Sequence, residues 1–499
     1  MKMKREVSLA RTSRGARGIL AGVFVAAAVV AQGTENRTVD GRLLEILQQR
    51  GVISGSEFTE LKKLEAELVM ASDLERRVDT KIEEMVARAN QDAPKVSYKP
   101  GSGMTFATAD GNFSMTIGVK VQARFTYDAL DRSTVLPAGS KAGHDRLDFS
   151  VPRARLILRG TAFDPHLRYQ VSMDMGGDQS RPASGTAFGG VSFANSGTVN
   201  ANRLTELKDA FVEWQVGDSR AFNVRAGQFK VQYSREALNP VTELAFVDRN
   251  PGSVVFAPSR STGVSLWGTF GGAKGDAIEY YASAMNGPNV TGTAYLEGEN
   301  AANDDDGLLW NARVAWNPLG AIPNQHLDLR PDAERNKLLI GLGANAWYHT
   351  DDNRRADGDS FDDTSFGFDV AAMWSGFYAT AEAHWRSDAQ RNGAIGAPPT
   401  SFANPDIESF GYFGQLNYCI VPTKFDIGVR YAELSSNGVL ATSNSGATAS
   451  REYLIVAGYF VNGHANKLQA DFGRVESHFL ASAANSDEWR LRVQFTVSF

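Results

Sequence analysis

The last eleven residues of the chain alternate strictly between apolar and polar side chains. A period of two predicts a β-strand that has one face in an apolar medium and the other in water. At about 3.3 Å per residue and a tilt of about 40°, the strand rises about 25–30 Å, close to the apolar band of an outer-membrane barrel. The alternative, an edge strand of a soluble sandwich, is usually about five or six residues long. The apolar positions are Trp489, Leu491, Val493, Phe495, Val497 and Phe499.

The same alternation recurs along the chain and predicts sixteen strands. A closed antiparallel barrel in a bacterial outer membrane has an even number of strands, as found here. Only the segment 451–461 departs from the pattern, because it is apolar on both faces. The predicted strands are 113–127, 149–162, 167–176, 205–216, 221–230, 261–270, 276–286, 307–317, 337–349, 364–374, 377–387, 408–419, 424–434, 451–461, 466–476 and 487–499.

The connections between these strands nearly alternate in length. Tight turns such as 163–166 and 462–464 alternate with long connections such as 128–148 and 231–260. Short periplasmic turns and long extracellular loops segregate in this way in outer-membrane barrels. One connection, 317–336, is long where a short turn is expected. Since lipid offers no hydrogen bonds to the backbone, the sheet must close, and sixteen strands then enclose a water-filled lumen.

The residues ahead of the barrel have a different pattern. A basic front and an apolar run predict that residues 1–31 are a signal peptide. Residues 32–103 are predicted to be a periplasmic helical segment and a linker, and residues 104–499 the barrel. From Leu61 to Ala89, apolar residues recur at spacings of three and four, which predicts a short coiled coil and hence oligomerisation. A single helix packed on a domain is the alternative.

Charge and composition exclude several classes of function. The net charge is −6, and residues 1–31 hold six basic residues and one acidic residue, so the remaining chain carries −11. This charge argues against nucleic acid as a partner. The single Cys419 excludes intramolecular disulfides and has no partner for a metal site. The seven His residues are scattered, and no Gly-x-Ser-x-Gly elbow is present, so we predict no enzyme, metal or cofactor.

Motifs in the middle of the chain are more specific. Arg225-Ala-Gly-Gln-Phe-Lys230 is followed by Phe246-Val-Asp-Arg249, Ala257-Pro-Ser-Arg260 and Gly263-Val264. This ordered set resembles the phosphate-selective porin O and P family, and the resemblance extends over 104–499. The resemblance implies a sixteen-stranded, homotrimeric porin in outer-membrane lipid, preceded by a helical segment. It also implies uptake of small anions, especially phosphate or polyphosphate, and a pore-lining role for Lys230.

The water-facing positions of the predicted strands carry thirteen basic and eight acidic residues, an excess of +5 inside an acidic chain. Rings of Arg or Lys favour anions, and the planar Arg fork suits phosphate. The alternative is that these charges pair across strands. The residues we predict to line the pore are Lys120, Arg124, Arg153, Arg155, Arg159, Arg168, Arg225, Lys230 and Arg260.

The connection 231–260 is expected to enter the lumen as a constriction. Its charges balance, with no dense basic cluster, which departs from strict phosphate selectivity. Three functions therefore stay open: an anion porin, a general and weakly selective porin, and a structural barrel that tethers the envelope through its coiled coil. The balanced charges of the constriction are Arg235, Arg249 and Arg260 against Glu236, Glu243 and Asp248.

Overall fold

A computed structural model describes most of the chain. The described residues are 41–130, 145–176, 206–274, 276–287, 307–351, 360–392, 406–437, 447–479 and 485–499, so the predicted signal peptide, 1–31, lies outside them. The chain divides into two compact units, residues 1–93 and residues 94–499. We describe each unit by itself.

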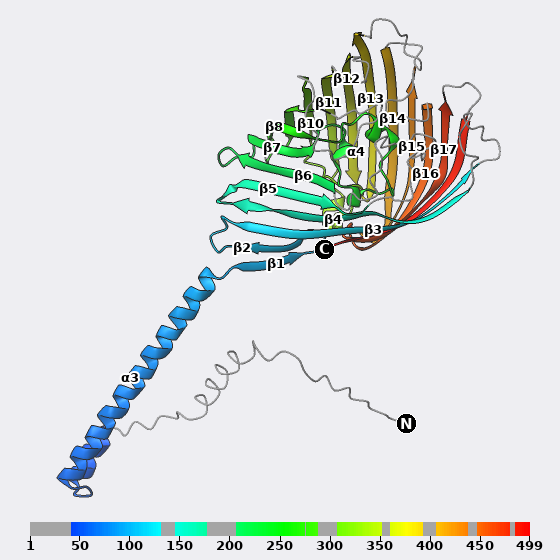
Figure 1. The fold of residues 1–499 in the computed structure, drawn as a ribbon. Helices are drawn as coiled ribbons and strands as arrows, with labels where there is room; N and C mark the ends of the chain where they lie inside the picture. The colour runs from blue at the N-terminus through cyan, green and yellow to red at the C-terminus, as the bar shows by residue number, and fades with distance from the viewer. Residues whose placement is uncertain are drawn as a thin grey trace, which may run out of the picture. The chain divides into compact units, whose positions relative to one another are not determined.

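The second unit is a closed β-barrel (Figure 1). Each barrel strand pairs antiparallel with the next in sequence, and β18 pairs with β3 to complete the ring. Every predicted strand overlaps an observed one, so the prediction of sixteen antiparallel strands is confirmed. The strands are β3 (Ser114–Leu130), β4 (Arg146–Ala162), β5 (Asp164–Asp174), β6 (Glu206–Gln215), β7 (Asn223–Lys230), β8 (Arg260–Phe270), β9 (Ile278–Met285), β10 (Leu309–Trp316), β11 (Leu339–Asp351), β12 (Ser360–Trp374), β13 (Phe377–Asn392), β14 (Asp406–Val421), β15 (Phe425–Ser436), β16 (Ala447–Asn462), β17 (Asn466–Phe479) and β18 (Asn485–Ser498).

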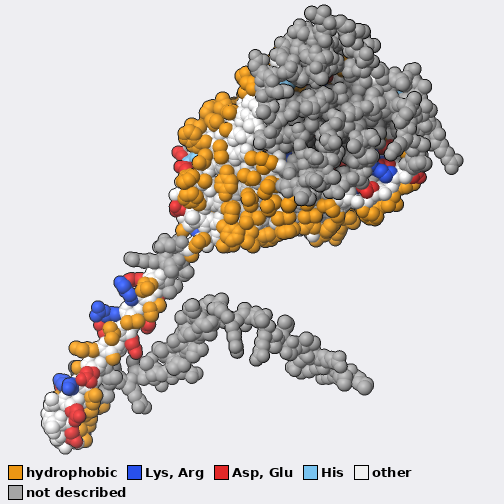
Figure 2. Space-filling view, in the orientation of Figure 1, with side chains coloured by type: hydrophobic (Ala, Val, Ile, Leu, Met, Phe, Trp, Pro, Cys, Tyr) orange, Lys and Arg blue, Asp and Glu red, His pale blue; other side chains and the backbone are white. Residues whose placement is uncertain are grey.

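The alternation along each strand separates the two faces of the wall. On β10, Trp310 on the outer face is 57% exposed, whereas Arg313, three residues later and on the inner face, is 3% exposed. Hydrophobic side chains predominate over the part of the barrel's outer surface that is coloured in Figure 2. Burying this surface in lipid is favourable because apolar area leaves water. Among the described residues, no helix is both long and apolar enough to cross a bilayer.

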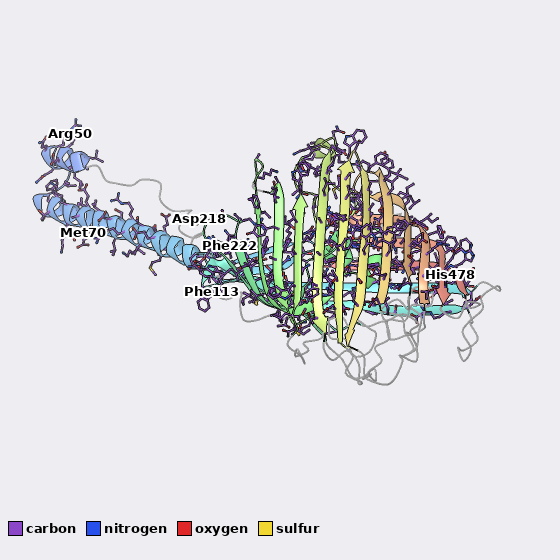
Figure 3. All side chains as sticks on the ribbon, turned by 90° about the horizontal axis from the view of Figure 1, so that it is seen from above. Arg50, Met70, Phe113, Asp218, Phe222 and His478 are labelled. Carbon is purple, nitrogen blue, oxygen red and sulfur yellow. The ribbon has the colours of Figure 1, made fainter. Side chains whose placement is uncertain are left out.

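The two ends of the barrel differ in their connections. Phe113 and the turn that contains Asp218 and Phe222 lie at the end with short turns, whereas His478 lies at the end with long connections (Figure 3). The chain enters β3 and ends after β18 at the short-turn end. By the usual arrangement of outer-membrane barrels, this end is periplasmic.

A hairpin that the sequence pattern did not predict precedes the barrel. β1 (Lys95–Lys99) pairs with β2 (Gly103–Ala107), and β2 pairs with β3 from Met104–Ile117 to Ala107–Ser114. Residues Lys95–Lys99, which the sequence pattern placed in the segment ahead of residue 104, therefore form a strand. The alternation there spans only five residues and stops at Pro100, too short to be separated from a loop. Gly103 is required, since its φ is +109° and a Cβ would lie 2.0 Å from the Ile117 oxygen.

The first unit contains the predicted helices. α2 (Gly41–Gln49) and α3 (Gly55–Asp92) are separated by a turn in which Gly51 has φ +68°. Ser54 and Glu57 form a capping box at the start of α3, which satisfies two backbone N–H groups reciprocally. Leu64, Val78 and other apolar side chains of the predicted heptads are exposed along α3.

Among the described residues, two connections of the barrel contain short helices. Residues 231–259, between β7 and β8, contain α4 (Arg235–Leu238), the 3-10 turn η1 (Val241–Glu243) and α5 (Pro251–Val255). This segment, which we call the constriction segment, lies within the ring of strands (Figure 1). Residues 317–338, between β10 and β11, contain α6 (Asp332–Arg335), and we call them the periplasmic segment.

Candidate functional site

The constriction segment is anchored to one side of the inner wall through α4. Ser234 Oγ donates to Glu382 Oε2 at 2.6 Å, and Arg235 Nε donates to Asp369 Oδ1 at 2.9 Å. Ser234, Arg235 and the two acidic residues are all buried. Charge-assisted hydrogen bonds in a buried setting are short and strong. The acidic residues of β12 and β13 therefore hold the segment in place.

The same segment reaches the opposite wall. Lys467 Nζ and Gln469 Nε2, both from β17, donate to the Leu244 oxygen at 2.6 Å and 2.8 Å. The Val247 N–H donates to Asp471 Oδ2 at 3.1 Å. The segment thus crosses the lumen from β12 and β13 to β17, as the sequence predicted for a constriction.

Asp248, at the tip of this crossing, is surrounded by arginines. Arg124 donates to both of its carboxylate oxygens, at 2.8 Å and 2.9 Å, and Arg492 donates to Oδ2 at 3.1 Å. Arg153 lies 3.7 Å from Oδ1, and Arg430 donates to the Asp248 backbone oxygen at 2.9 Å. Burial alone would raise the pKa of Asp248, but the positive charges of Arg124, Arg492 and Arg153 outweigh it and hold the pKa well below its usual range.

The periplasmic segment also enters the lumen and meets the constriction segment there. His326 Nε2 lies 2.6 Å from Glu236 Oε2, and the His326 N–H donates to the Glu243 oxygen at 2.9 Å. The Ala245 N–H donates to His326 Nδ1 at 3.2 Å. Burial would raise the pKa of Glu236, but His326 outweighs it and the pKa falls below its ordinary value. Segments from opposite ends of the barrel therefore contact each other inside it.

An apolar cluster joins the two segments to the wall. Phe246 from the constriction segment and Leu327 from the periplasmic segment pack against Leu454, Val456 and Phe460 of β16, and all five are buried. The three β16 residues lie on the inner face, which water would cover in an open pore. This contact explains why the inner face of β16 is apolar from Leu454 to Phe460.

The predicted pore-lining residues of β3 and β4 lie beside the constriction segment. Lys120 Nζ donates to Thr242 Oγ1 at 3.0 Å, whereas Arg124 and Arg153 face Asp248. Arg155 pairs with Asp174 of β5 at 2.8 Å. Arg159 is exposed, and the described residues give it no hydrogen bond or ion pair.

The remaining predicted residues also have partners. Arg225 pairs with Glu213 at 2.6 Å, and Arg168 Nη1 lies 3.6 Å from the same carboxylate. Arg260 pairs with Asp209 at 2.9 Å. Lys230 Nζ donates to the Ala237 oxygen at 2.7 Å, at the end of α4. Lys230, at the end of β7, therefore holds the constriction segment against the barrel wall.

The sequence did not predict the role of the periplasmic segment. Two signals pointed to it: the connection 317–336 is too long for a periplasmic turn, and the inner face of β16 is apolar from Leu454 to Phe460. Neither signal identified His326 or Leu327 as the contact residues, because their partners come from distant parts of the chain. Within the described ranges, no group of three or more His, Cys, Asp or Glu side chains is arranged to hold a metal ion.

Comparison with known proteins gives one family and several similar solved structures. The family model described as phosphate-selective porin O and P matches residues 119–499. The similar solved structures include an anion-selective porin from Comamonas acidovorans, at 12% identity and TM-score 0.48, which covers 77% of this chain and 99% of that chain. They also include the outer membrane channel DcaP of Acinetobacter baumannii, at 13% identity and TM-score 0.47, with 80% and 100% covered. No curated protein matches the chain.

Proposed function

Because the chain belongs to the phosphate-selective porin O and P family, and is thus a porin of the bacterial outer membrane, we propose that it conducts small anions, including phosphate or polyphosphate. The observation that carries the proposal is the position of the lumen's basic residues. Lys120, Arg153, Arg155 and Arg159 lie on the adjacent strands β3 and β4, and β18 adds Arg492 beside them. A row of positive charge along one wall favours anions in transit.

Ion pairing within the lumen favours a second candidate, a general and weakly selective porin. Of the nine predicted pore-lining residues, only Arg159 has no hydrogen bond or ion pair among the described residues, and the others contact carboxylates, amides or backbone oxygens. A paired arginine presents a weaker field to a passing ion than a free one. Selectivity for phosphate then depends on how far a solute competes with these internal partners.

Reversal potentials in a KCl gradient, measured on single channels in planar bilayers, test the proposal. We expect anion preference in the natural chain, and a smaller preference when Arg155→Ala is combined with Arg159→Ala. Arg474→Ala is the matched control, because Arg474 lies on the outer face of β17 and its loss leaves the lumen unchanged. Phosphate and pyrophosphate added to chloride then rank the solutes by how strongly they block conductance. Cation preference in the natural chain refutes the anion porin.

We propose further that the chain forms a homotrimer and that α3 contributes a coiled coil to it. The exposed apolar row on α3 supports this. Apolar side chains at heptad spacing stabilise an oligomer when they pack against the same row on α3 of other copies of the chain. Crosslinking of the full chain in detergent tests it, with Val78→Asp and Ile82→Asp expected to weaken association. Arg76→Ala, which changes an exposed residue, is the control. Monomers in the natural chain, together with binding of α3 to cell wall, would support an envelope tether instead.

A further inference from the structure

The inner face of β6 carries a phenylalanine at a position where the alternation of the wall calls for a polar residue. Phe211 lies on the same face as the buried Glu213, whereas its neighbour Val212 is 53% exposed on the outer face. The Phe211 ring packs against Phe229, with 6.1 Å between the ring centroids, yet the residue stays partly exposed. Because this face of the wall borders the lumen, a solute in the pore can contact the ring.

Two arginines from the neighbouring strands lie on one side of this ring. Gln170 of β5 is opposite Phe211, and Arg159 of β4 is opposite Gln170. Arg168 lies on the same face of β5, two residues before Gln170. Diagonal neighbours on adjacent strands are about 7–8 Å apart, a distance that a long side chain spans. The guanidinium groups of Arg159 and Arg168 therefore reach a solute that rests on the Phe211 ring.

A third arginine lies over the ring itself. The guanidinium carbon of Arg225 is 4.6 Å from the centroid of Phe211, which is a cation–π contact. Arg225 Nε and Nη2 both donate to Glu213 Oε2, at 2.9 Å and 2.6 Å. Its third nitrogen, Nη1, makes no hydrogen bond to any of the described residues. Arg225 therefore offers one donor edge to a further acceptor beside the ring.

The charges around Phe211 favour an anion. Arg168 and Arg225 share the Glu213 carboxylate, at 3.6 Å and 2.6 Å. Arg159 has no ion pair among the described residues, so three arginines against one carboxylate leave an excess of two positive charges. Asp209, the next carboxylate towards the extracellular end of β6, already pairs with its own arginine at 2.9 Å.

From these contacts we propose that the inner wall of β4–β7 binds an aromatic anion, namely a flat ring that carries a carboxylate or phosphate group. The ring lies against Phe211, and the anionic group contacts Arg159, Arg168 and Nη1 of Arg225. Aromatic rings attract each other beyond the gain from burial, and arginine forks donate paired hydrogen bonds to carboxylates and phosphates. The inference rests on the proposed anion porin and adds a solute class that composition and net charge do not indicate.

Block of chloride current through single channels of the full chain tests the inference. The paired probes are benzoate against acetate, and phenyl phosphate against inorganic phosphate. We expect the aromatic member of a pair to block at about tenfold lower concentration, since only it contacts the ring. A preference in either pair supports the site and identifies its head group. Cyclohexanecarboxylate, which has the size of benzoate but no flat π face, is expected to block about threefold more weakly than benzoate.

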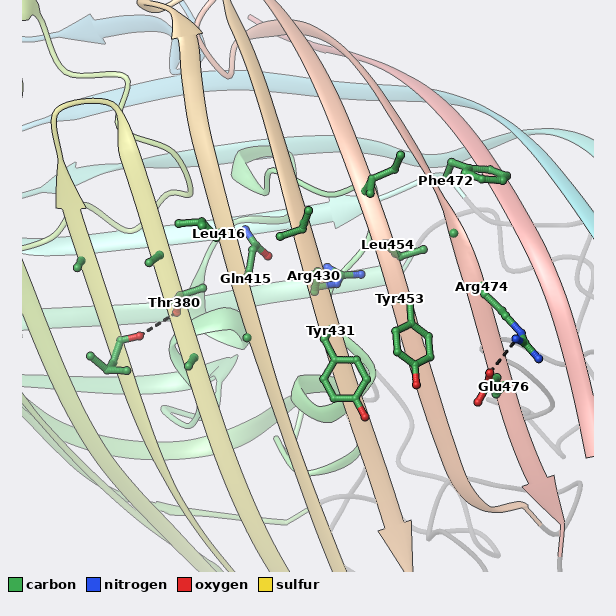
Figure 4. Close-up of a pocket in the computed structure, with 18 of the residues that line it drawn as sticks. Thr380, Gln415, Leu416, Arg430, Tyr431, Tyr453, Leu454, Phe472, Arg474 and Glu476 are labelled. Atoms are coloured by element: carbon green, nitrogen blue, oxygen red, sulfur yellow. Dashed lines mark hydrogen bonds and ion pairs between the residues drawn. The ribbon is translucent and has the colours of Figure 1, made fainter.

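Variants of the wall test the ring and the arginines separately. Phe211→Leu keeps an apolar side chain but removes the ring, so the preference for the aromatic probe should fall about threefold or more. Phe472→Leu is the matched control, because Phe472 is exposed on the outer face of β17, among the lipid-facing side chains of Figure 4. Arg159→Gln should weaken block by both members of a pair to a similar extent, because the arginine contacts the head group that they share.

Two results separate this inference from the proposed function. An anion-preferring natural channel without aromatic preference in either pair overturns the inference and leaves the anion porin standing, whereas cation preference overturns both. The inference is also overturned if Phe211→Leu inserts and keeps the full aromatic preference. If Phe211→Leu does not insert, the natural channel decides, because block by cyclohexanecarboxylate as strong as block by benzoate overturns the inference.

Discussion

Replacing Asp248 with Asn is expected to convert an internal ion pair into an anion-binding position. The substitution keeps the size of the side chain and removes the charge that now occupies Arg124, Arg153 and Arg492. Arg492 retains Asp471 at 2.8 Å, whereas Arg124 retains only the uncharged Gln494 amide among its side-chain partners. Arg124 is therefore the side chain that a solute anion will contact.

The expected gain follows from the contacts that are lost. A hydrogen bond to a charged group contributes about 1.5–3 kcal/mol net, and a solute anion that replaces the Asp248 carboxylate on Arg124 recovers this amount. Since about 1.4 kcal/mol corresponds to a tenfold change, phosphate affinity should rise about tenfold to hundredfold. The variant should also lose stability, because breaking a buried ion pair costs about 3–5 kcal/mol.

Block of chloride current by added phosphate, with reversal potentials recorded on the same channels, measures the effect. Asp218→Asn is the matched control, because Asp218 is fully exposed in the turn between β6 and β7 and pairs only loosely with His166 at 3.8 Å. The reasoning is refuted if Asp248→Asn folds and inserts, yet phosphate blocks it no better than the natural channel. That result would mean that permeating ions do not reach the arginines around Asp248.

Three further predictions concern pH, the periplasmic segment and the hairpin. The pKa of Asp248 is held low in the folded chain. The stability that this carboxylate contributes is therefore present above the ordinary pKa of about 3.9 and is lost only as pH falls through the lower pKa of the folded chain. Conductance and ion selectivity that depend on Asp248 should therefore be constant from pH 7 to about pH 5. Leu327→Ala removes a buried contact that stabilises by about 2–5 kcal/mol, so single-channel conductance should increase or fluctuate as the periplasmic segment loosens, whereas Leu319→Ala, at an exposed position of the same segment, should not change it. Gly103→Ala forces a Cβ against the Ile117 oxygen and should lower the unfolding temperature, whereas Gly414→Ala, in open space, should not.

The wall of the barrel was predictable because its signal is local. In β18, the residues that face lipid and those that face the lumen follow from parity alone, and Arg490 and Arg492 are buried on the inner face as parity requires. The short hairpin strand β1 was missed because five residues before Pro100 give too little alternation. Local pattern is thus sufficient for long strands and insufficient for short ones.

The interior of the barrel was predictable only in outline. The parity of the strands identified an excess of basic residues at water-facing positions, and the resemblance to the porin family implied that the connection 231–260 enters the lumen. The pairing of Asp248 with Arg124 joins positions that are 124 residues apart, and the contact of His326 with Glu236 joins two separate connections. Such contacts depend on how the segments fold into the lumen, which no spacing in the sequence encodes.

The meeting of two strand ends along β3 has a consequence for assembly. Phe499, the last residue, exchanges backbone hydrogen bonds with Val119 at 2.6 Å and 2.9 Å, and the partner of Ile117 is already Met104 of β2. The final strand and the hairpin thus lie end to end against one edge, with Gly118 between them. A slip of β18 by two residues towards β2 would drive the terminal aromatic ring into the hairpin. The hairpin therefore blocks the position that a misregistered β18 would occupy, so the barrel can close in only one register.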